Sequence, residues 1–128
     1  MYELTVNALF NAAHNLRNYK GKCEEIHGHN WKVEVTVKCD KLDKAGMVID
    51  FKKIKESLGK VLEKIDHKHL NKISPFNKLS PSSENIARYI YQKLKNGKLF
   101  SGVYSWSLYK VTVWETDTAS ASYSEEYK

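Results

Sequence analysis

The sequence predicts an α+β protein with an antiparallel sheet and two helices on one of its faces. Two observations favour this class. Near both ends of the chain apolar residues alternate with polar ones, the pattern of half-buried strands, whereas between residues 50 and 94 they recur at helical spacing. The resulting order, β-β-α-α-β-β, favours one sheet covered on one side. The 128 residues are expected to form a single domain, residues 1–128.

The first strand is predicted to begin at Leu4. Its even positions are apolar and separated by mostly polar residues; the apolar positions are Leu4, Val6, Ala8, Phe10 and Ala12. Successive strand residues point to opposite faces of a sheet, so these even positions share the buried face. His14 continues the same row and is expected on the buried side.

A second strand is predicted after the loop at residues 18–22. Here the odd positions are apolar, namely Trp31, Val33, Val35, Val37 and Cys39. His27 and His29 precede them with the same parity. Both histidines are therefore expected on the face that this strand buries.

Three histidines on the buried faces of one hairpin indicate a metal site. Antiparallel pairing would bring both faces together near the loop, so His14, His27 and His29 are expected to converge. Three neutral imidazoles with one open position are a ligand set of catalytic zinc. The alternative is three hydrogen-bonded core histidines, which requires that three buried polar rings are satisfied at once.

Two helices are predicted in the middle of the chain. Asp50 can cap the first, whose apolar positions follow helical spacing; they are Phe51, Ile54, Leu58, Val61, Leu62 and Ile65. The second is expected to start at Ser80, with Pro81 in its first turn, and to end at Gly97. Its apolar residues are Ile86, Ala87, Ile90 and Leu94.

The last two strands are predicted from Val103 to Glu115 and at residues 121–123, with a turn at 116–120 between them. A change of apolar parity near Lys110 indicates a bulge. Val111, Val113 and Glu115 then share one face. A glutamate on an inward row needs a cation or hydrogen-bond donors, unless it is simply a strand-end residue in water.

Charge and composition exclude several classes of function. Lys and Arg number 21 against 15 Asp and Glu, a net charge of +6, but they are scattered and no basic helix or zinc-finger spacing accompanies them. Nucleic acid is therefore not an expected partner. No segment approaches the roughly 20 apolar residues of a membrane span, and residues 1–4 lack a signal pattern. A cytoplasmic protein without membrane contact is expected.

Six short motifs are spread along the chain. They are FNAAHNL at residues 10–16, CEEIHGHNW at 23–31, VIDF at 48–51, DHKHLN at 66–71, SSEN at 82–85 and VWET at 113–116. Together they resemble the 6-pyruvoyl-tetrahydropterin synthase superfamily, and within it the 6-carboxy-tetrahydropterin synthases of the queuosine pathway. The resemblance implies the tunnelling fold (T-fold), with subunits that assemble into a barrel. A homohexamer of two stacked trimers, with active sites at subunit interfaces, is typical.

The resemblance also implies catalytic roles. His14, His27 and His29 match the zinc ligands of the family, in agreement with the strand parity. Cys23 matches the catalytic thiol. A nearby cation would lower the pKa of this thiol and so favour the thiolate, which acts as general base. Zinc would act as a Lewis acid on the hydroxyls of the substrate side chain.

Further residues match the family's proton-handling and substrate-binding positions. Asp66 and His67 match a second proton-handling pair, which a neighbouring subunit normally offers to the site. Glu115 matches the carboxylate that anchors the pterin ring, whose N–H edge can donate two parallel hydrogen bonds. Three more positions match residues near the same ring, namely Ser82, Ser83 and Glu84.

The implied activity is that of a zinc-dependent lyase acting on 7,8-dihydroneopterin triphosphate. The short spacing of three residues between Cys23 and His27 favours formation of 6-carboxy-5,6,7,8-tetrahydropterin, with release of acetaldehyde and triphosphate. The alternatives are a 6-pyruvoyl-tetrahydropterin synthase and, with Glu24 or Glu25 in the loop, a folate-type enzyme that forms a hydroxymethyl pterin. A non-catalytic module stabilised by zinc is a further alternative.

Overall fold

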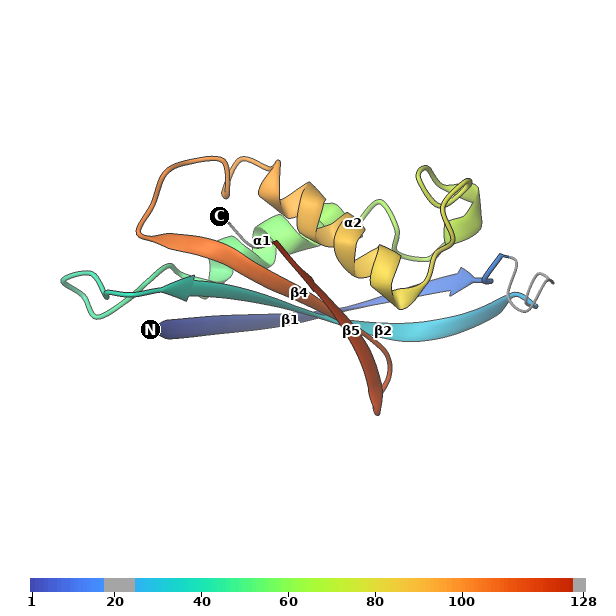
Figure 1. Ribbon diagram of the computed structural model, residues 1–128, viewed down its shortest axis with the longest axis horizontal. Helices are drawn as coiled ribbons and strands as arrows, with labels where there is room; N and C mark the ends of the chain where they lie inside the picture. Colours follow the sequence, from blue (N-terminus) through green and yellow to red (C-terminus); the bar gives the residue numbers. More distant parts are fainter. Residues whose placement is uncertain (18–24, 126–128) are drawn as a thin grey trace.

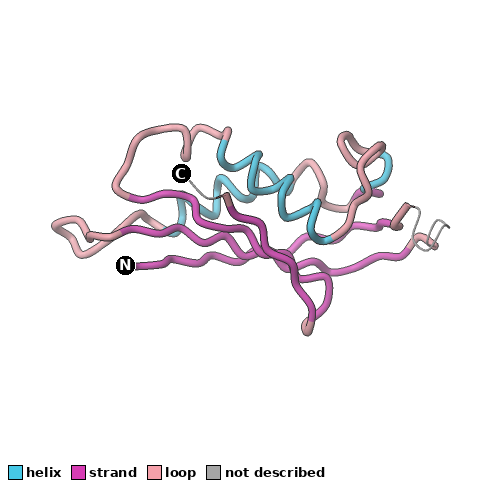
Figure 2. The backbone as a smooth tube through the Cα atoms, viewed as in Figure 1, coloured by secondary structure: helices cyan, strands magenta, loops and turns pink. Residues whose placement is uncertain are grey.

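Residues 1–17 and 25–125, which the computed structural model describes, form a five-stranded sheet with two α-helices on one face (Figure 1). The strand order is β3-β1-β2-β4-β5. The strands are β1 (Tyr2–His14), β2 (His27–Cys39), β3 (Lys68–His69), β4 (Trp106–Thr116) and β5 (Ala119–Ser124), and the helices are α1 (Phe51–Leu62) and α2 (Ser83–Lys95). Figure 2 shows both helices on the same side of the strands, which confirms the predicted class.

The long hairpin of β1 and β2 has the register that the alternation predicts. Val6 lies opposite Val35 and Phe10 opposite Trp31, so each apolar residue meets an apolar partner. The same register continues to the end of the hairpin, where His14 lies opposite His27. Because the side-chain period of a strand is two, this register brings all three histidine side chains to the helix-covered face.

β4 carries two irregularities, and the second lies at the site end of the sheet. Its pairing with β2 shifts between Thr36 and Val37, which leaves Tyr109 as an extra residue and confirms the bulge predicted near Lys110. Its pairing with β5 shifts again between Trp114 and Thr116, so the residue between them is also extra. A bulge changes the direction of a side chain, and here that side chain is Glu115.

The first helix begins where the sequence predicts. The carboxylate of Asp50 accepts a hydrogen bond from the Lys52 N–H at 2.9 Å and so satisfies a free donor of the first turn. The helix ends at Leu62, although Ile65 in the following turn is still buried. In the described part of the chain neither helix is long and apolar enough to span a membrane.

The predicted start of the second helix at Ser80 was wrong. The N-cap is Ser82, whose hydroxyl accepts a hydrogen bond from the Asn85 N–H at 3.2 Å. Ser80 is used elsewhere, because its hydroxyl accepts from the Arg17 N–H at 3.3 Å and its carbonyl accepts from the Asn85 side chain at 2.8 Å. These contacts hold Pro81 before the helix rather than in its first turn.

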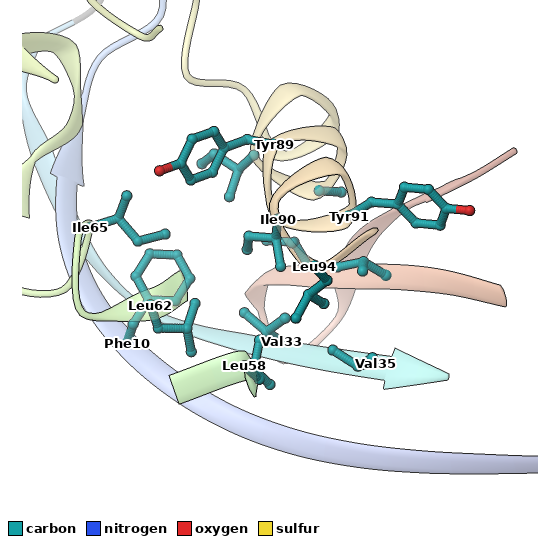
Figure 3. Packing of buried hydrophobic residues seen from close by; sticks show 14 of the residues in the cluster. Phe10, Val33, Val35, Leu58, Leu62, Ile65, Tyr89, Ile90, Tyr91 and Leu94 are labelled. Atoms are coloured by element: carbon teal, nitrogen blue, oxygen red, sulfur yellow. The ribbon is translucent and has the colours of Figure 1, made fainter. Parts of the chain in front are cut away.

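The core lies between the helices and the covered face of the sheet (Figure 3). Residues of both helices and of the central strands are fully buried there, among them Ile54, Leu58, Ile90, Val33 and Val35. At about 25 cal/mol per Å² of buried apolar surface, this layer supplies the main driving force for folding. The packing of the two helices thus stabilises the sheet that carries the site.

The ends of the remaining strands differ from the prediction. β4 begins at Trp106 instead of Val103, because Val103 is fully exposed in the preceding loop. β5 begins at Ala119, two residues before the predicted start. The sequence pattern also missed β3, which pairs in parallel with Ala12 and Ala13 of β1. A strand of two residues is too short to show alternation.

Candidate functional site

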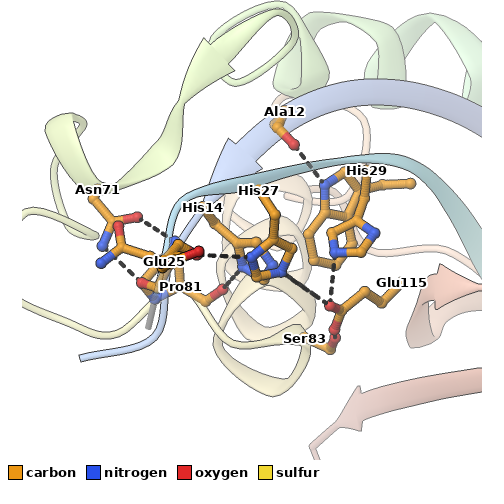
Figure 4. Close-up of polar contacts among 11 residues, drawn as sticks. Ala12, His14, Glu25, His27, His29, Asn71, Pro81, Ser83 and Glu115 are labelled. Atoms are coloured by element: carbon orange, nitrogen blue, oxygen red, sulfur yellow. Dashed lines mark hydrogen bonds and ion pairs between the residues drawn. The ribbon is translucent and has the colours of Figure 1, made fainter. Parts of the chain in front are cut away.

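The three histidines converge at the loop end of the hairpin, as the alternation predicts. Ring centroids are 4.6 Å apart for His14 and His27, 4.7 Å for His27 and His29, and 5.4 Å for His14 and His29. Figure 4 shows the rings turned towards one another. His14 is buried, but the side chains of His27 and His29 remain 35% and 22% exposed, so the expectation of three buried histidines was wrong for these two. The cluster is therefore open to solvent on one side.

Backbone carbonyls orient two of the rings. His14 Nδ1 lies 2.7 Å from the carbonyl oxygen of Pro81, and His27 Nδ1 lies 3.0 Å from that of Glu25 (Figure 4). A carbonyl can only accept, so in each neutral ring Nδ1 carries the proton and Nε2 keeps its lone pair. Histidines that bind metals typically donate their second N–H in this way.

A tryptophan forms the floor beneath the histidines. The Trp31 ring lies edge-on to His14 with centroids 4.9 Å apart, and to His29 with centroids 5.4 Å apart. Its indole N–H donates to the Ala12 carbonyl at 3.3 Å, and its ring stacks on Phe10. Trp31 is fully buried, so the floor is dry and limits the motion of the two imidazoles.

Glu115 of β4 reaches the same cluster. Its Oε1 lies 3.0 Å from His29 Nε2, 3.5 Å from His14 Nε2 and 3.8 Å from His27 Nε2. Its Oε2 accepts a hydrogen bond from the Ser83 hydroxyl at 3.1 Å (Figure 4). The sequence predicted that Glu115 needs a cation or donors, and the structure places one donor, the Ser83 hydroxyl, and three imidazole nitrogens beside it.

The proximity of Glu115 to the histidines was missed by the sequence reasoning. β4 is far from the hairpin in sequence and joins it only by pairing with β2, where Val113 lies opposite Val33 and Trp114 opposite Lys32. The inward parity of Glu115 was the available signal. It predicted the face but not the neighbours, because register between distant strands is not encoded in the alternation of either one.

The donor set suits a divalent metal ion. His14, His27, His29 and Glu115 each offer one ligand atom, and these atoms lie within 4.8 Å of one another. His14 Nε2 is buried and has no hydrogen-bond partner among the described residues, although an unsatisfied buried polar atom costs free energy. Imidazole and carboxylate ligands are those of zinc and related ions. The residues thus fit a metal centre.

The first turn of α2 lies next to Glu115, but its three predicted site residues differ in position. Ser83 donates to the Glu115 carboxylate. Ser82 is the N-cap, and its hydroxyl is used within the helix. Glu84 is exposed. Of the three, Ser83 is the one that the structure brings into contact with the cluster.

Asp66 and His67 form a pair outside the histidine cluster. His67 Nδ1 lies 3.0 Å from Asp66 Oδ1, and the His67 side chain is 74% exposed on a residue with a φ of 58°. The Asn11 N–H donates to Asp66 at 2.9 Å. This hydrogen bond, followed by the charge and hydrogen bonds of His67, lowers the pKa of Asp66 below its ordinary value of 3.8.

An open pocket of about 600 Å³ lies beside this pair, lined by residues 11–13, 28–30 and 67–69. The pocket joins the strand end that carries His29 to the turn that carries His67. His69, which the sequence left without a role, also lines it. His67 of the pair thus lines a concave surface.

Cys23, the predicted catalytic thiol, lies outside the described residues. The Arg17 guanidinium donates to the backbone carbonyls of Phe76, Leu79 and Asn71. Arg17 therefore fixes the loop before α2 in the described structure.

Comparisons with known proteins show the family of this chain. The family described as 6-pyruvoyl tetrahydropterin synthase matches residues 3–126. The chain is 39% identical to a putative 6-pyruvoyl tetrahydrobiopterin synthase of Caenorhabditis elegans, over 84% of this chain and 83% of that protein. It is 38% identical to the 6-carboxy-5,6,7,8-tetrahydropterin synthase of Synechocystis sp., over 89% of this chain and 86% of that protein.

A solved structure is similar over almost the whole chain. The structure of Caenorhabditis elegans 6-pyruvoyl tetrahydropterin synthase has a TM-score of 0.78 with this chain at 30% identity, and the match covers 98% of each. This likeness confirms the predicted tunnelling fold of the subunit. The relatives carry the names of two different reactions, so the comparisons do not separate them.

Proposed function

This chain belongs to the 6-pyruvoyl tetrahydropterin synthase family, and from that premise we propose that it converts 7,8-dihydroneopterin triphosphate and one water molecule to 6-carboxy-5,6,7,8-tetrahydropterin, acetaldehyde and triphosphate. The observation that carries the proposal is the convergence of three histidines and a carboxylate at one open site. The spacing of three residues between Cys23 and His27 supports the carboxy branch. The likeness to the Synechocystis enzyme supports it as well.

The proposed cofactor is Zn²⁺, held by His14, His27 and His29. The support is the group of ligand atoms that these residues offer within 4.8 Å of one another, together with the carbonyl contacts that orient the rings of His14 and His27 through Nδ1. When bound, zinc would supply Lewis acidity to the hydroxyls of the substrate side chain. The partly exposed rings of His27 and His29 leave room for those hydroxyls to approach.

Glu115 is proposed to bind the pterin ring. A carboxylate can accept two parallel N–H bonds from the guanidine-like edge of a pterin, as it does from arginine. The Ser83 hydroxyl holds one carboxylate oxygen and would orient the group. Ser82 and Glu84 flank Ser83 at the start of α2 and are proposed to lie near the same ring. Glu115 thus sets the distance between the ring and the histidines.

Cys23 and the Asp66–His67 pair are proposed to move protons. Cys23 would remove the proton from the side-chain carbon, as a thiolate favoured by the neighbouring positive charge. Asp66 accepts from His67 Nδ1 and so leaves Nε2 as the exchanging atom. The exposure of His67 and its position outside the cluster support its delivery to the site of a neighbouring subunit. We therefore propose a homohexamer with sites at the subunit interfaces.

The test is to incubate the zinc-loaded protein with 7,8-dihydroneopterin triphosphate and identify the products by mass. We expect 6-carboxy-5,6,7,8-tetrahydropterin and acetaldehyde. Cys23→Ala should lose turnover but keep its zinc, whereas Cys39→Ala, at the opposite end of β2, should keep both. A folded, zinc-loaded protein without any pterin turnover would instead support the non-catalytic module.

A second candidate is formation of 6-pyruvoyl-tetrahydropterin. The likeness to the Caenorhabditis elegans protein and structure of that name favours it. This reaction eliminates triphosphate and retains all the side-chain carbons, so it releases no acetaldehyde. The same assay therefore separates the two candidates, and a hydroxymethyl pterin would point to the folate-type reaction.

A further inference from the structure

We propose that Glu115 is an exchangeable fourth metal ligand, which closes the resting site and leaves the metal when a pterin ring binds. The inference rests on the proposed metal and pterin binding, and it adds a resting state to the three-histidine site. In that state Glu115 is bound to the metal together with His14, His27 and His29. In the substrate complex the same carboxylate is bound to the ring.

The resting state follows from the contacts of one oxygen atom. Glu115 Oε1 lies within 3.8 Å of Nε2 of all three histidines, and its shortest distance is 3.0 Å, to His29. An ion held by the three Nε2 atoms would therefore be within reach of this oxygen. Three imidazoles and one carboxylate make four protein ligands, the number found in closed zinc sites.

The exchange follows from how Glu115 is held. Its second oxygen accepts only the Ser83 hydroxyl among the described contacts, and its side chain is 32% exposed. Glu115 is also the extra residue in the pairing of β4 with β5, so no ladder partner fixes its backbone directly. A carboxylate that accepts two N–H bonds from a ring edge has to turn Oε1 away from the histidines. Ring binding and metal ligation thus compete for the same atom.

The competition has a consequence for the order of events. With Glu115 as a fourth ligand, the four residues would hold the ion without a substrate hydroxyl. Once the ring takes the carboxylate, the three histidines alone would hold the ion, and its Lewis acidity would become available to the hydroxyls of the substrate side chain. The anchor of the ring would therefore also be the switch that makes the site reactive.

The first test measures metal binding without any pterin. Co²⁺ is titrated into metal-free protein and its visible absorption recorded, because this absorption is stronger for four ligands than for six. We expect Glu115→Gln to bind Co²⁺ about 10- to 100-fold more weakly, the range for loss of groups that support a metal site, and to absorb less intensely. Asp117→Asn removes the same charge two residues away and should leave both unchanged. Equal affinity and equal absorption in Glu115→Gln would overturn the proposal.

Misfolding of the variant is excluded by a second variant and a second measurement. Glu115→Asp keeps the carboxylate on a shorter side chain and should retain part of the Co²⁺ affinity. Thermal unfolding of the metal-free variants shows whether the fold is intact. If Glu115→Asp binds no better than Glu115→Gln while both remain folded, a ligand role for the carboxylate is refuted.

The second test measures whether the metal and the pterin ring compete for the Glu115 carboxylate. The probe is pterin itself, which has the ring edge but lacks the side-chain hydroxyls of the substrate. By reciprocity, a metal that holds Glu115 must weaken pterin binding by the factor by which pterin weakens metal binding. We expect pterin to bind several-fold more weakly to zinc-loaded than to metal-free protein. Equal affinity of pterin for the zinc-loaded and the metal-free protein would overturn the proposed exchange but not the proposed function. If pterin bound to neither form, both the exchange and the proposed function would be overturned.

Discussion

At the scale of single residues, the site depends on side chains whose proton positions are set by their neighbours. The Pro81 carbonyl fixes the ring of His14 and the Glu25 carbonyl fixes that of His27. Asp66 does the same for His67, outside the histidine cluster. In each case Nδ1 contacts an acceptor of the protein, so the position of a neighbouring loop or turn sets the orientation of the ring.

Asp66 gives a direct test of this arrangement. Its lowered pKa arises first from the Asn11 N–H and then from His67. We expect His67→Ala to raise the pKa of Asp66 towards 3.8 but to leave it below that value, because the hydrogen bond from Asn11 remains. Carboxyl NMR titration measures both values. An unchanged pKa would show that His67 does not interact with Asp66 in solution.

The same shift gives the sign of a pH effect on stability. A carboxyl whose pKa is lower in the folded state stabilises the fold above its unfolded pKa, and this contribution is lost as the pH falls through the folded pKa. For Asp66 the loss therefore lies below its ordinary value of 3.8. Its carboxyl is exposed, so the effect belongs to the local turn.

At the scale of elements, the start of α2 connects helix stability to the site. Ser82 caps the helix, Ser83 contacts Glu115, and the carbonyl of Pro81 holds His14. A helix N-terminus also carries a partial positive charge that favours a nearby carboxylate. One turn of backbone thus positions both a candidate metal ligand and the proposed ring anchor.

Substitution of Ser82 tests this element. Ser82→Ala removes the acceptor for the Asn85 N–H, and we expect it to lower the free energy of unfolding by about 1 kcal/mol, the typical value of an N-cap. Urea denaturation measures the change. Ser82→Asp keeps an acceptor and should retain most of the stability.

Ser80→Ala is the matched comparison, since Ser80 was the cap predicted from sequence. Its hydroxyl accepts one longer contact from the Arg17 N–H, at 3.3 Å, and does not cap the helix. We therefore expect a smaller loss than for Ser82→Ala. A larger loss in Ser80→Ala would mean that the helix starts at residue 80 in solution.

At the scale of the whole molecule, the site lies at one end of the sheet, where it meets the core only at Trp31 and its neighbours. The buried residues of α1 pack against β1 and those of α2 against β4 and β5, and most of this apolar layer lies away from His27 and His29. The described fold therefore has a source of stability that is independent of a metal. This separation distinguishes a catalytic centre from a zinc site on which folding depends.

Removal of the metal tests the separation. We expect the chelated protein to lose pterin turnover but to keep its circular dichroism spectrum and a cooperative unfolding transition. Its midpoint should fall modestly, because a ligand that binds only the folded state stabilises it by about 2.7 kcal/mol at 100 times its dissociation constant. Complete unfolding on chelation would favour the non-catalytic, zinc-stabilised module. Restored turnover after zinc addition is the control.

The sequence determined the elements and the faces of their residues. Alternation in β1 and β2 predicted the hairpin and placed His14, His27 and His29 on one side, and Asp50 predicted the start of α1. These features were predictable because the side-chain periods of strands and helices are local properties of the chain. The short β3 and the observed start of β4 at Trp106 were not predictable in this way. A strand of two residues is too short to show alternation, and the apolar but exposed Val103 was counted as part of the strand.

Only the tertiary structure decided which distant groups meet. It brought Glu115 to the histidines through the pairing of β4 with β2, and it brought the Pro81 carbonyl to His14 through the packing of the loop before α2. It also made Ser82 the cap, because Ser80 is bound to Arg17 and Asn85. The physical reason is common to all three. Contacts between segments far apart in the chain depend on register and packing, which no local period specifies.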